Sequence, residues 1–383
     1  MSQTHVVIFS HGFGVRQDSR GMFTDIVAAL PKHIKTVLFD YGQFDGATNT
    51  LTVPPLSVQV EKLREVIATA RKHHPSATID LLCHSQGCVV AGLLKPTGEY
   101  VRKIILIAPP AKLDTTDMQR IFARPGAQLD FHGNSRLPRR DGTTTIVPQK
   151  YWQDIERLNP VALYNALTDV AAVRAVHANQ DEIIGDRDFS KLRPEIKNIY
   201  LDANHDFTGA ARPSLIHAIQ GELERVPVVN EKDEVIAHKF RDELKDDDIY
   251  RVSALWIKNS KGAILLAQRS FGKHHDPGRW QGAVAGTVEE DETYLENIIK
   301  ETSEEIGIEN ILSKAGPKTL ARDAYTYFVQ WFTATVDKPA EDFKINKDEV
   351  LQVRWFTPDE LHRNLRERPN EYTNGTAWAL ENL

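Results

Sequence analysis

Residues 78–94, TIDLLCHSQGCVVAGLL, are the stretch from which the first half of the chain is interpreted. The apolar run at 79–82 predicts a buried strand, and the apolar residues at 89–94 predict a helix. The turn between them is tight, and Ser85 stands at its tip. A serine in this position projects its hydroxyl beyond the strand, beside the positive end of the new helix. The stretch therefore predicts an exposed nucleophile between a strand and a helix.

The five residues 83–87, C-H-S-Q-G, resemble the nucleophile elbow of the α/β-hydrolase family, G-x-S-x-G. Cys83 takes the place of the first glycine, and Gly87 keeps the second. The alternative is an ordinary serine-glycine turn that caps a helix. The resemblance implies that the backbone N–H of Gln86 is one donor of an oxyanion hole. It places the second donor at Phe13, in an H-G-F motif after the first strand, for which a simple glycine turn is the alternative.

Two further side chains follow later strands. Asp181 comes after a predicted strand at 170–176, and His205 comes after the last predicted strand of this half at 198–201. The order Ser, Asp, His resembles that of the family, which implies Asp181 as the acid and His205 as the base. Asp186 and Asp188 are the fallback acids. His217 is interpreted as a helix-surface or packing residue.

The alternation of short buried strands with helices predicts an α/β fold with a doubly wound parallel sheet for residues 1–225. Residues 111–167 interrupt the alternation with a helix, a polar stretch and a possible hairpin at 143–147. α/β-hydrolases insert a cap over the active site at this point, and such a cap selects the substrate. Three arginines in it either recognise an acidic substrate or, in the preferred interpretation, lie on a solvated face: Arg136, Arg139 and Arg140.

Length and composition predict a globular protein of two domains. The chain has 383 residues, 41% of them hydrophobic and 26% charged. A net charge of −6 disfavours nucleic acid or an anionic membrane as a partner, so small-molecule substrates are expected. No apolar run has the length of a membrane span or signal peptide, which favours a cytoplasmic location. The two cysteines, Cys83 and Cys88, are predicted to be reduced packing residues, and no cofactor is expected in the first half.

The second half, residues 226–383, contains the most specific pattern in the chain. After a predicted hairpin with its turn at 259–262 come Gly286, five residues, Glu292, seven residues, and then KETSEEIGI at 300–308. This resembles the Nudix box, in which the last part reads R-E-U-x-E-E-x-G-U with U aliphatic. The resemblance implies an α/β/α Nudix fold with a mixed sheet. It also implies hydrolysis of a nucleoside diphosphate linked to another group.

The chemistry of the predicted helix at 293–306 agrees with this resemblance. One stripe is apolar and is expected to face a core: Leu295, Ile298, Ile299 and Ile306. Another face carries carboxylates at i, i+3 and i+4, which repel one another unless a hard cation such as Mg²⁺ or Mn²⁺ joins them. A solvated acidic face is the alternative. The resemblance implies the metal-site residues Gly286, Glu301, Glu304 and Glu305, with Glu304 also catalytic.

Two positions of the second half depart from the Nudix pattern. Lys300 replaces an arginine whose planar contact orients the neighbouring glutamate, and Thr302 replaces an aliphatic residue. The same half resembles the branch containing isopentenyl diphosphate isomerase, but it has no cysteine for that reaction. Glu349 is a further candidate base. The aromatic residues of a predicted strand at 324–336 are interpreted mainly as packing residues rather than a stacking platform for a base.

The two halves together predict a bifunctional hydrolase. The first would hydrolyse a small carboxylic ester, thioester or lactone with a Ser-His-Asp triad. The second would hydrolyse a nucleoside-diphosphate-type phosphoanhydride with a divalent metal. In the alternative, the Nudix half binds a nucleotide without cleaving it and regulates the esterase half. The sequence does not indicate the oligomeric state.

Overall fold

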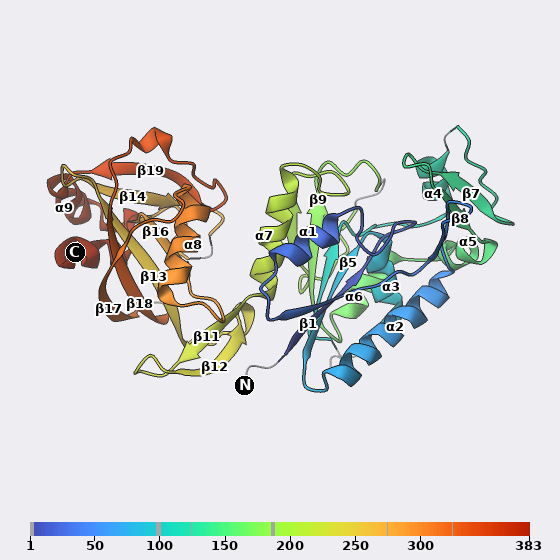
Figure 1. Cartoon of the computed structure of the whole chain (residues 1–383), viewed down its shortest axis with the longest axis horizontal. Coiled ribbons are helices and arrows are strands. Elements are labelled where there is room, and N and C mark those ends of the chain that lie inside the picture. The colour runs from blue at the N-terminus through green and yellow to red at the C-terminus, as the bar shows by residue number, and fades with distance from the viewer. Residues whose placement is uncertain (1–3, 97–100, 124, 185–187, 274, 324) are drawn as a thin grey trace. The chain divides into compact units, whose positions relative to one another are not determined.

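The computed structural model describes residues 4–96, 101–123, 125–184, 188–273, 275–323 and 325–383. The chain forms two compact units, Met1–Gln220 and Gly221–Leu383, and the division falls within the last turns of helix α7 (Ala211–Leu223) (Figure 1). Each unit has its own sheet and its own core.

The first unit is built on a six-stranded parallel sheet with the order β10-β9-β6-β5-β1-β2. The strands are β1 (His5–Ser10), β2 (Ile34–Leu38), β5 (Thr78–His84), β6 (Lys103–Ile107), β9 (Ala172–Ala178) and β10 (Lys197–Leu201). The central strands β1, β5 and β6 are buried almost throughout, which explains their nearly continuous apolar sequences.

Helices cover both faces of this sheet, as predicted. Helices α1 (Met22–Ala29) and α7 lie on one side, and α2 (Leu56–His73), α3 (Gln86–Leu94) and α6 (Pro160–Leu167) lie on the other (Figure 1). The chain runs from β1 outward to β2 and then returns to place β5 on the opposite side of β1. The order of strands therefore reverses between β1 and β5, which is where open α/β sheets bind their ligands.

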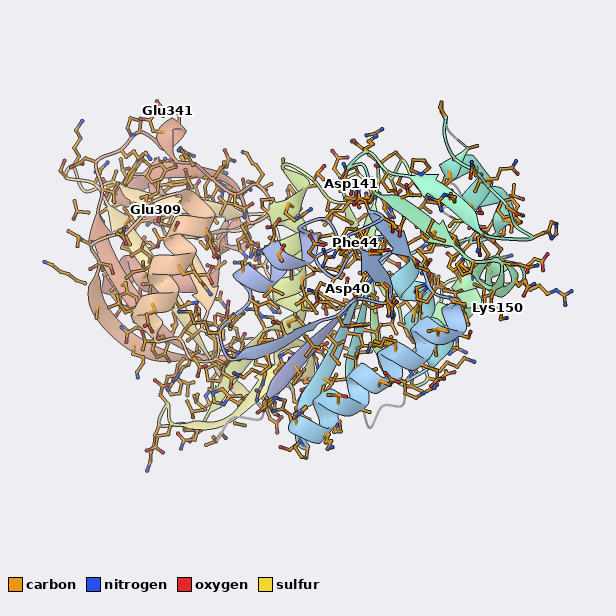
Figure 2. The ribbon with its side chains drawn as sticks, turned by 45° about the vertical axis from the view of Figure 1, so that its right-hand side comes forward. Asp40, Phe44, Asp141, Lys150, Glu309 and Glu341 are labelled. Atoms are coloured by element: carbon orange, nitrogen blue, oxygen red, sulfur yellow. The ribbon has the colours of Figure 1, made fainter. Side chains whose placement is uncertain are left out.

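A second, four-stranded sheet lies in the cap, with the order β3-β4-β8-β7. Its strands are β3 (Gln43–Asp45), β4 (Thr50–Thr52), β7 (Ser135–Pro138) and β8 (Thr144–Val147), accompanied by α4 (Thr115–Phe122) and α5 (Gln149–Ile155). The predicted hairpin is β7–β8. Strand β4, which pairs with β8, and strand β3, which pairs with β4, were not predicted. Asn49 Nδ2 donates to the carbonyl of Gly142 at 2.9 Å, beside Asp141 in the β7–β8 turn (Figure 2).

The second unit is a mixed sheet between two helical layers. Strand β13 (Ile249–Lys258) pairs in parallel with β18 (Thr326–Thr335) and antiparallel with its other neighbours. Its inward residues alternate: Leu255 packs in a core with Ile298 of α8 (Tyr294–Ile306), whereas Trp256 packs with Leu361 of α9 (Pro358–Glu367). The remaining elements are β11 (Arg225–Val229), β12 (Val235–Phe240), β14 (Ile264–Arg269), β19 (Val350–Phe356) and α10 (Asn374–Asn382).

Two features of this sheet depart from what the sequence pattern predicts. The small residues of 280–286 predict a single strand, but this stretch is broken at Ala283 into β15 (Trp280–Gly282), which pairs with β14, and β16 (Val284–Thr287), which pairs with β13. Strand β17 (Lys314–Arg322) was not predicted. It pairs with β18 alone and is largely exposed, so it lacks the apolar alternation of a half-buried strand.

Candidate active sites

Ser85 occupies a strained turn between β5 and α3. Its φ of 54° and ψ of −120° lie outside the regions that a serine usually adopts. Its N–H donates to the carbonyl of Ile107 on β6 at 2.8 Å. Gly87 allows α3 to pack closely against the end of β1, because a Cβ at this position would lie 2.2 Å from the carbonyl oxygen of Ser10. Cys83 and Cys88 are both buried and free, as predicted.

A hydrogen-bonded chain joins Ser85 to the two side chains singled out downstream. His205 Nε2 lies 3.0 Å from Ser85 Oγ, and His205 Nδ1 lies 2.7 Å from Asp181 Oδ2. The three residues follow β5, β9 and β10, whose carboxyl ends meet at one edge of the parallel sheet. The structure therefore brings together three residues that the sequence separates widely.

The environment of Asp181 keeps its carboxylate ionised. Burial raises the pKa of Asp181, but its hydrogen bond with His205, the charge of His205 and the N–H groups of Ile184 and Ile183 lower it more, so the pKa lies below its usual value. These N–H groups donate to Asp181 Oδ1 at 2.8 and 2.9 Å. An ionised Asp181 accepts the Nδ1–H of His205 and leaves Nε2 as the acceptor for the Ser85 hydroxyl.

The other candidates do not join this chain. The carboxylate of Asp188 accepts the N–H of Ser190 at 3.0 Å instead. Asp186 lies outside the described residues. His217 is exposed on α7.

His84, which sequence reasoning missed, holds the backbone of His205. Its Nε2 lies 3.2 Å from the carbonyl of His205, and its Nδ1 lies 3.0 Å from Ser19 Oγ. Burial and the neighbouring His205 lower the pKa of His84 to about 3, so the ring is neutral and donates one proton to the His205 carbonyl. The carboxylate of Glu182 accepts the His205 N–H at 3.1 Å. Both backbone polar groups of His205 are therefore held.

The lowered pKa of His84 predicts a pH-dependent stability. A histidine whose pKa is lower when folded than when unfolded destabilises the fold as the pH falls below about 6.5, because the unfolded chain binds the proton more readily. We expect His84→Gln to reduce the loss of unfolding temperature between pH 7 and pH 5. The exposed His217→Gln variant is the control. Equal losses in wild type and His84→Gln would contradict this explanation.

The Phe13 loop lies directly beside the elbow. A Cβ on Gly12 would come within 3.2 Å of Ser85 Cβ. The N–H of Tyr41 donates to His11 Nε2 at 3.0 Å, so His11 Nδ1 carries the proton and donates to the Gly12 carbonyl at 2.9 Å. Burial lowers the pKa of His11, which favours this neutral form. His11 thus fixes the loop that carries Phe13.

Gln86 is the first residue of α3, so its N–H has no carbonyl partner one turn earlier in the helix. Its side-chain amide is fixed on both sides. Nε2 donates to Gln59 Oε1 at 2.7 Å, and Oε1 accepts the hydroxyl of Tyr151. The Tyr151 ring also packs against Phe13, with ring centroids 5.3 Å apart. Tyr151 of the cap therefore contacts both residues proposed as oxyanion donors.

These contacts predict that Tyr151→Phe lowers kcat for an ester about 10-fold with little change in KM. The expected loss is smaller than the loss of about 10² to 10³-fold that follows removal of a whole oxyanion donor, because Tyr151 only contacts the proposed donors. Tyr164→Phe is the matched control, because it also removes a buried hydroxyl, which donates to the Pro110 carbonyl. Steady-state kinetics and thermal unfolding separate the two effects. Equal kcat losses in both variants would indicate a general packing role for Tyr151.

The cap arginines divide into two groups. Arg136 and Arg140 are exposed, in agreement with a solvated face. That interpretation was wrong for Arg139, whose guanidinium lies over the rings of Phe13 and Phe122, 5.6 and 5.2 Å from their centroids. Cation–π attraction favours this position, which places a positive charge beside the Phe13 loop.

In the second unit, helix α8 carries the acidic residues. It begins with a capping box between Thr293 and Glu296 and ends at Gly307, whose φ of 67° suits glycine. Its buried apolar residues include Ile298 and Ile306. Leu295 was predicted on the same stripe but is 47% exposed, so that assignment was wrong.

Thr302 and Tyr294 contribute to the packing of α8, whereas Leu295 does not. Thr302 lies fully buried between Ile298 and Ile306, and its hydroxyl donates to the carbonyl of Ile298 at 2.6 Å. Tyr294, one position before Leu295, packs against the core on this side. The hydroxyl of Thr302 is therefore satisfied within the helix, and the substitution for an aliphatic residue preserves the packing.

The three glutamates of α8 that the sequence predicts at the metal site, Glu301, Glu304 and Glu305, have different surroundings. Glu301 lies against Gly286, where a Cβ would come within 2.2 Å of its carboxyl carbon. Glu305 is buried, and its Oε2 has no hydrogen-bond partner in the described part of the chain. Glu304 is exposed. Their oxygens do not all lie within 4.8 Å of one another; among the described residues only His84, His205 and Asp206 meet that distance.

The electrostatics of this face fit a divalent cation. Burial raises the pKa of Glu305 to about 8, and the charge of Glu301 adds to this effect. Burial also raises the pKa of Glu301 to about 7, with Lys300 opposing the shift and Glu304 reinforcing it. Carboxylate oxygens, an orphaned oxygen on Glu305 and the space beside Gly286 are features that suit Mg²⁺ or Mn²⁺.

Lys300 holds the loop before the helix. Its Nζ lies 2.6 Å from Glu289 Oε1 and 2.7 Å from Glu292 Oε1. Asn297 Nδ2 donates to Glu292 Oε2 at 3.0 Å and to Glu301 Oε1 at 3.3 Å. The ammonium of Lys300 thus joins two carboxylates of the loop before α8, while Asn297 contacts Glu301.

Two further sequence candidates also have defined surroundings. Glu349 forms an ion pair with Lys273. Of the aromatic residues on and beside β18, Trp331 is buried in the core as predicted, whereas Tyr325 is 40% exposed.

The contact between Gly286 and Glu301 predicts a large effect from one methyl group. Gly286→Ala should displace the Glu301 carboxylate and lower metal-dependent hydrolysis of a diphosphate by about 10 to 100-fold, the usual cost of disturbing the support of a metal ligand. Gly316→Ala is the control, because a Cβ there meets only ordinary contacts of 3.4 Å or more. Unchanged turnover and Mn²⁺ affinity in Gly286→Ala would contradict the assignment.

Two family models match the chain, and their matched ranges overlap at residues 249–255. The family model described as the alpha/beta hydrolase family matches residues 7–255, and the model of the NUDIX domain matches residues 249–377. The chain belongs to the α/β-hydrolase family and carries a Nudix domain in its C-terminal part. Both domains belong to hydrolase families. No described helix has the length and hydrophobicity needed to span a membrane.

Individual relatives match one part of the chain. The uncharacterized Nudix hydrolase YfcD of Escherichia coli K12 is 30% identical over 166 residues, which are 41% of this chain and 84% of that protein. The prenyl-diphosphate phosphatase of Methanosarcina mazei is 30% identical over 147 residues, 38% of this chain and 86% of that protein. The esterase domain of a Rhodothermus marinus protein aligns with 57% of this chain and 86% of its own, at 17% identity and a TM-score of 0.42.

Proposed function

We propose that the first unit hydrolyses a small carboxylic ester, thioester or lactone with Ser85 as the nucleophile. The observation that carries this proposal is the chain of hydrogen bonds from Asp181 through His205 to Ser85. Serine at its ordinary pKa is a weak nucleophile, so it needs a base within hydrogen-bond distance. His205 Nε2 is at that distance.

The reaction follows from these positions. Ser85 Oγ attacks the acyl carbon while its proton passes to His205 Nε2, and Asp181 stabilises the imidazolium. The N–H groups of Phe13 and Gln86 bind the oxyanion of the tetrahedral intermediate. His205 then returns its proton to the leaving oxygen or sulfur as the bond to the acyl carbon breaks. A water molecule, deprotonated by His205, releases the acyl group from Ser85 by the same steps.

A fluorophosphonate tests this proposal directly, because it reacts with activated serines. We expect a single adduct on Ser85, located by mass spectrometry, and none on Ser85→Ala or on His205→Ala. Well-folded wild-type protein that forms no adduct would refute the triad.

For the second unit we propose metal-dependent hydrolysis of a phosphoanhydride in a nucleoside-diphosphate-type compound. Glu301, Glu304 and Glu305 would hold Mg²⁺ or Mn²⁺, with Glu304 also serving in catalysis. The ion would neutralise phosphate charge and increase the acidity of the attacking water. Lys300 keeps Glu289 and Glu292 in place, and Gly286 leaves room for Glu301. Water adds to phosphorus, and the bridging P–O bond breaks.

The relative from Methanosarcina mazei broadens the range of substrates to be tested. Its name describes a phosphatase of prenyl diphosphates. A diphosphate on an isoprenoid chain presents the same anionic group as a nucleoside diphosphate compound but no base. We therefore include both classes in the substrate panel and propose the diphosphate, rather than the base, as the group common to substrates.

A second candidate function makes the Nudix domain a sensor that binds a nucleotide without cleaving it. The exposure of Glu304 and the separation of the three carboxylates favour this candidate. Titration of magnesium against the panel discriminates the two. Release of phosphate or nucleoside monophosphate that disappears in Glu304→Gln supports catalysis. Saturable binding without turnover supports sensing and contradicts the hydrolase proposal.

A further inference from the structure

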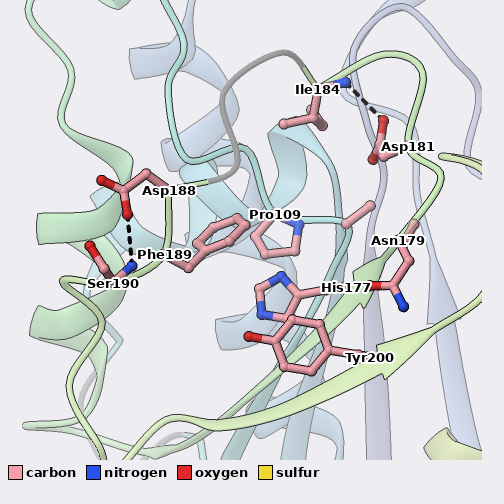
Figure 3. A pocket seen from close by; sticks show the side chains of 11 residues that line it. Pro109, His177, Asn179, Asp181, Ile184, Asp188, Phe189, Ser190 and Tyr200 are labelled. Carbon is pink, nitrogen blue, oxygen red and sulfur yellow. Dashed lines mark hydrogen bonds between the residues drawn. The ribbon is translucent and has the colours of Figure 1, made fainter.

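The first unit contains a cavity of about 490 Å³ beside the hydrogen-bonded chain (Figure 3). Its walls include Pro109 after β6, His177 at the end of β9, Phe189 and Tyr200 of β10. Of the residues in the hydrogen-bonded chain, Asp181 lines it, whereas Ser85 and His205 do not. The cavity lies at the carboxyl ends of parallel strands and has the volume of a small-molecule site.

Aromatic rings form one side of this cavity. The ring of His177 is stacked on that of Tyr200, with centroids 4.8 Å apart and planes at 19°. The centroid of the Phe189 ring lies 4.4 Å from that of the His177 ring. Phe189 points toward Pro109 in Figure 3. Tyr200 is 59% exposed although it belongs to a strand of the central sheet. A flat apolar ring would extend this stack and cover the exposed aromatic surface.

One ring nitrogen of His177 offers a hydrogen-bond acceptor in this wall. Asn198 Nδ2 donates to the carbonyl of Ile196 at 3.1 Å, which turns Asn198 Oδ1 toward His177 Nε2 at 2.8 Å. His177 Nε2 therefore carries the proton, and Nδ1 of the neutral ring is an acceptor. Figure 3 shows the second ring nitrogen on the side of Phe189 and Pro109. No described residue donates a hydrogen bond to it.

The charged groups among the described lining residues disfavour an anionic ligand. Asp181 and Asp188 both line the cavity. Burial raises the pKa of Asp181, but its hydrogen bond with His205 and the charge of His205 lower it more, and the hydroxyl and N–H of Ser190 lower the pKa of Asp188. Two carboxylates repel a ligand carboxylate or phosphate. An uncharged ring with a hydroxyl group fits both the aromatic wall and the acceptor.

We infer that this cavity is a binding site for a small, neutral hydroxyaromatic molecule of the phenol class, separate from the position of Ser85. The ring of the ligand packs against Phe189 and the stacked pair of His177 and Tyr200. Its hydroxyl donates to His177 Nδ1. The inference rests on the cavity itself and not on the hydrolytic activity, so direct binding tests it without any turnover.

The test uses 4-fluorophenol and the full chain with Ser85→Ala, observed by ¹⁹F NMR. We expect saturable binding that is about 5-fold tighter than that of 4-fluoroanisole, which lacks the donor, since one hydrogen bond contributes about 1 kcal/mol. His177→Phe keeps a ring but removes the acceptor, so it should abolish this preference. Binding of 4-fluorobenzoate should be weaker than that of 4-fluorophenol.

A pair of matched variants locates the site. Phe189→Ala should weaken 4-fluorophenol about 5-fold, because aromatic contacts contribute about 0.5 to 1.5 kcal/mol. Phe44→Ala removes an exposed aromatic from β3 in the cap and should change the affinity less than about 2-fold (Figure 2). Absence of saturable binding, or equal affinities in the Phe189→Ala and Phe44→Ala proteins, would overturn the inference. So would equal affinity for 4-fluorophenol and 4-fluoroanisole.

Discussion

Ser85→Ala is expected to lower kcat/KM for a carboxylic ester by about 10⁴-fold or more and to leave magnesium-dependent diphosphate hydrolysis unchanged. Without Oγ there is no nucleophile for His205 to activate, and only binding and the oxyanion donors remain. The measurement is the hydrolysis of a series of p-nitrophenyl esters by the full chain. Alanine keeps the Cβ of Ser85 and so has the same backbone strain at this φ, and the variant should fold as well as wild type, which thermal unfolding checks.

Two histidine variants give the matched control for this effect. His205→Ala should reduce ester hydrolysis about as much as Ser85→Ala, whereas the exposed His217→Ala should leave it unchanged. The double variant of Ser85 and His205 should be no slower than either single variant, since residues that act as a unit are not additive. Ester turnover that persists in Ser85→Ala would contradict the proposed nucleophile.

Glu305→Gln is expected to lower metal-dependent diphosphate hydrolysis by about 100-fold or more. Changing a residue that only supports a metal ligand costs about 10 to 100-fold, and Glu305 is itself a proposed ligand. The amide removes the charge of a buried group whose Oε2 has no protein partner among the described residues. Phosphate release is measured against Mg²⁺ and Mn²⁺ concentration, and metal binding is measured by calorimetry.

The control for this variant is Glu341→Gln, an exposed glutamate in the 3₁₀ turn Ala340–Asp342 of the same unit (Figure 2). It changes the net charge equally but should not alter metal affinity or turnover. If Glu305→Gln retains full activity with the same metal dependence, the metal does not need this carboxylate and the site must be reassigned.

Much of the architecture could be predicted because the burial of a strand and the spacing of residues within a motif are visible in the sequence itself. Buried parallel strands have continuous apolar stretches, as β5 and β6 do, and their carboxyl ends meet at one edge. Asp181 and His205 could therefore be placed near Ser85 from their order alone. The Nudix spacing likewise indicated that Gly286 and Glu301 belong to one site, although it did not reveal their direct contact.

Other features depend on contacts that no local pattern records. Strands β3 and β4 have three residues each, too few for a period to be recognised. They pair with each other, and β4 also pairs with β8 from a distant part of the chain. The position of Arg139 depends on its contacts with Phe13 and Phe122, and nothing in the local sequence distinguishes it from the exposed Arg136 and Arg140. Helix α8 was predicted correctly, but the apolar pattern alone could not distinguish Tyr294 from Leu295 as the residue at the edge of the core.

The supporting residues of the active site were also beyond sequence reasoning. His84 precedes the nucleophile, but its role depends on the carbonyl of His205 and the hydroxyl of Ser19. Tyr151 contacts Phe13 and Gln86 only because the cap folds over them. A histidine beside the nucleophile and an aromatic pair in the cap were the available signals, and neither identifies its partner.

We propose that one chain carries two independent hydrolytic sites. A crossed assay tests this independence: wild type, Ser85→Ala and Glu305→Gln are each measured on the best ester and the best diphosphate from the two panels. We expect Ser85→Ala to lose only ester hydrolysis and Glu305→Gln to lose only metal-dependent diphosphate hydrolysis. Loss of both activities in either variant, with the fold intact, would contradict independent sites.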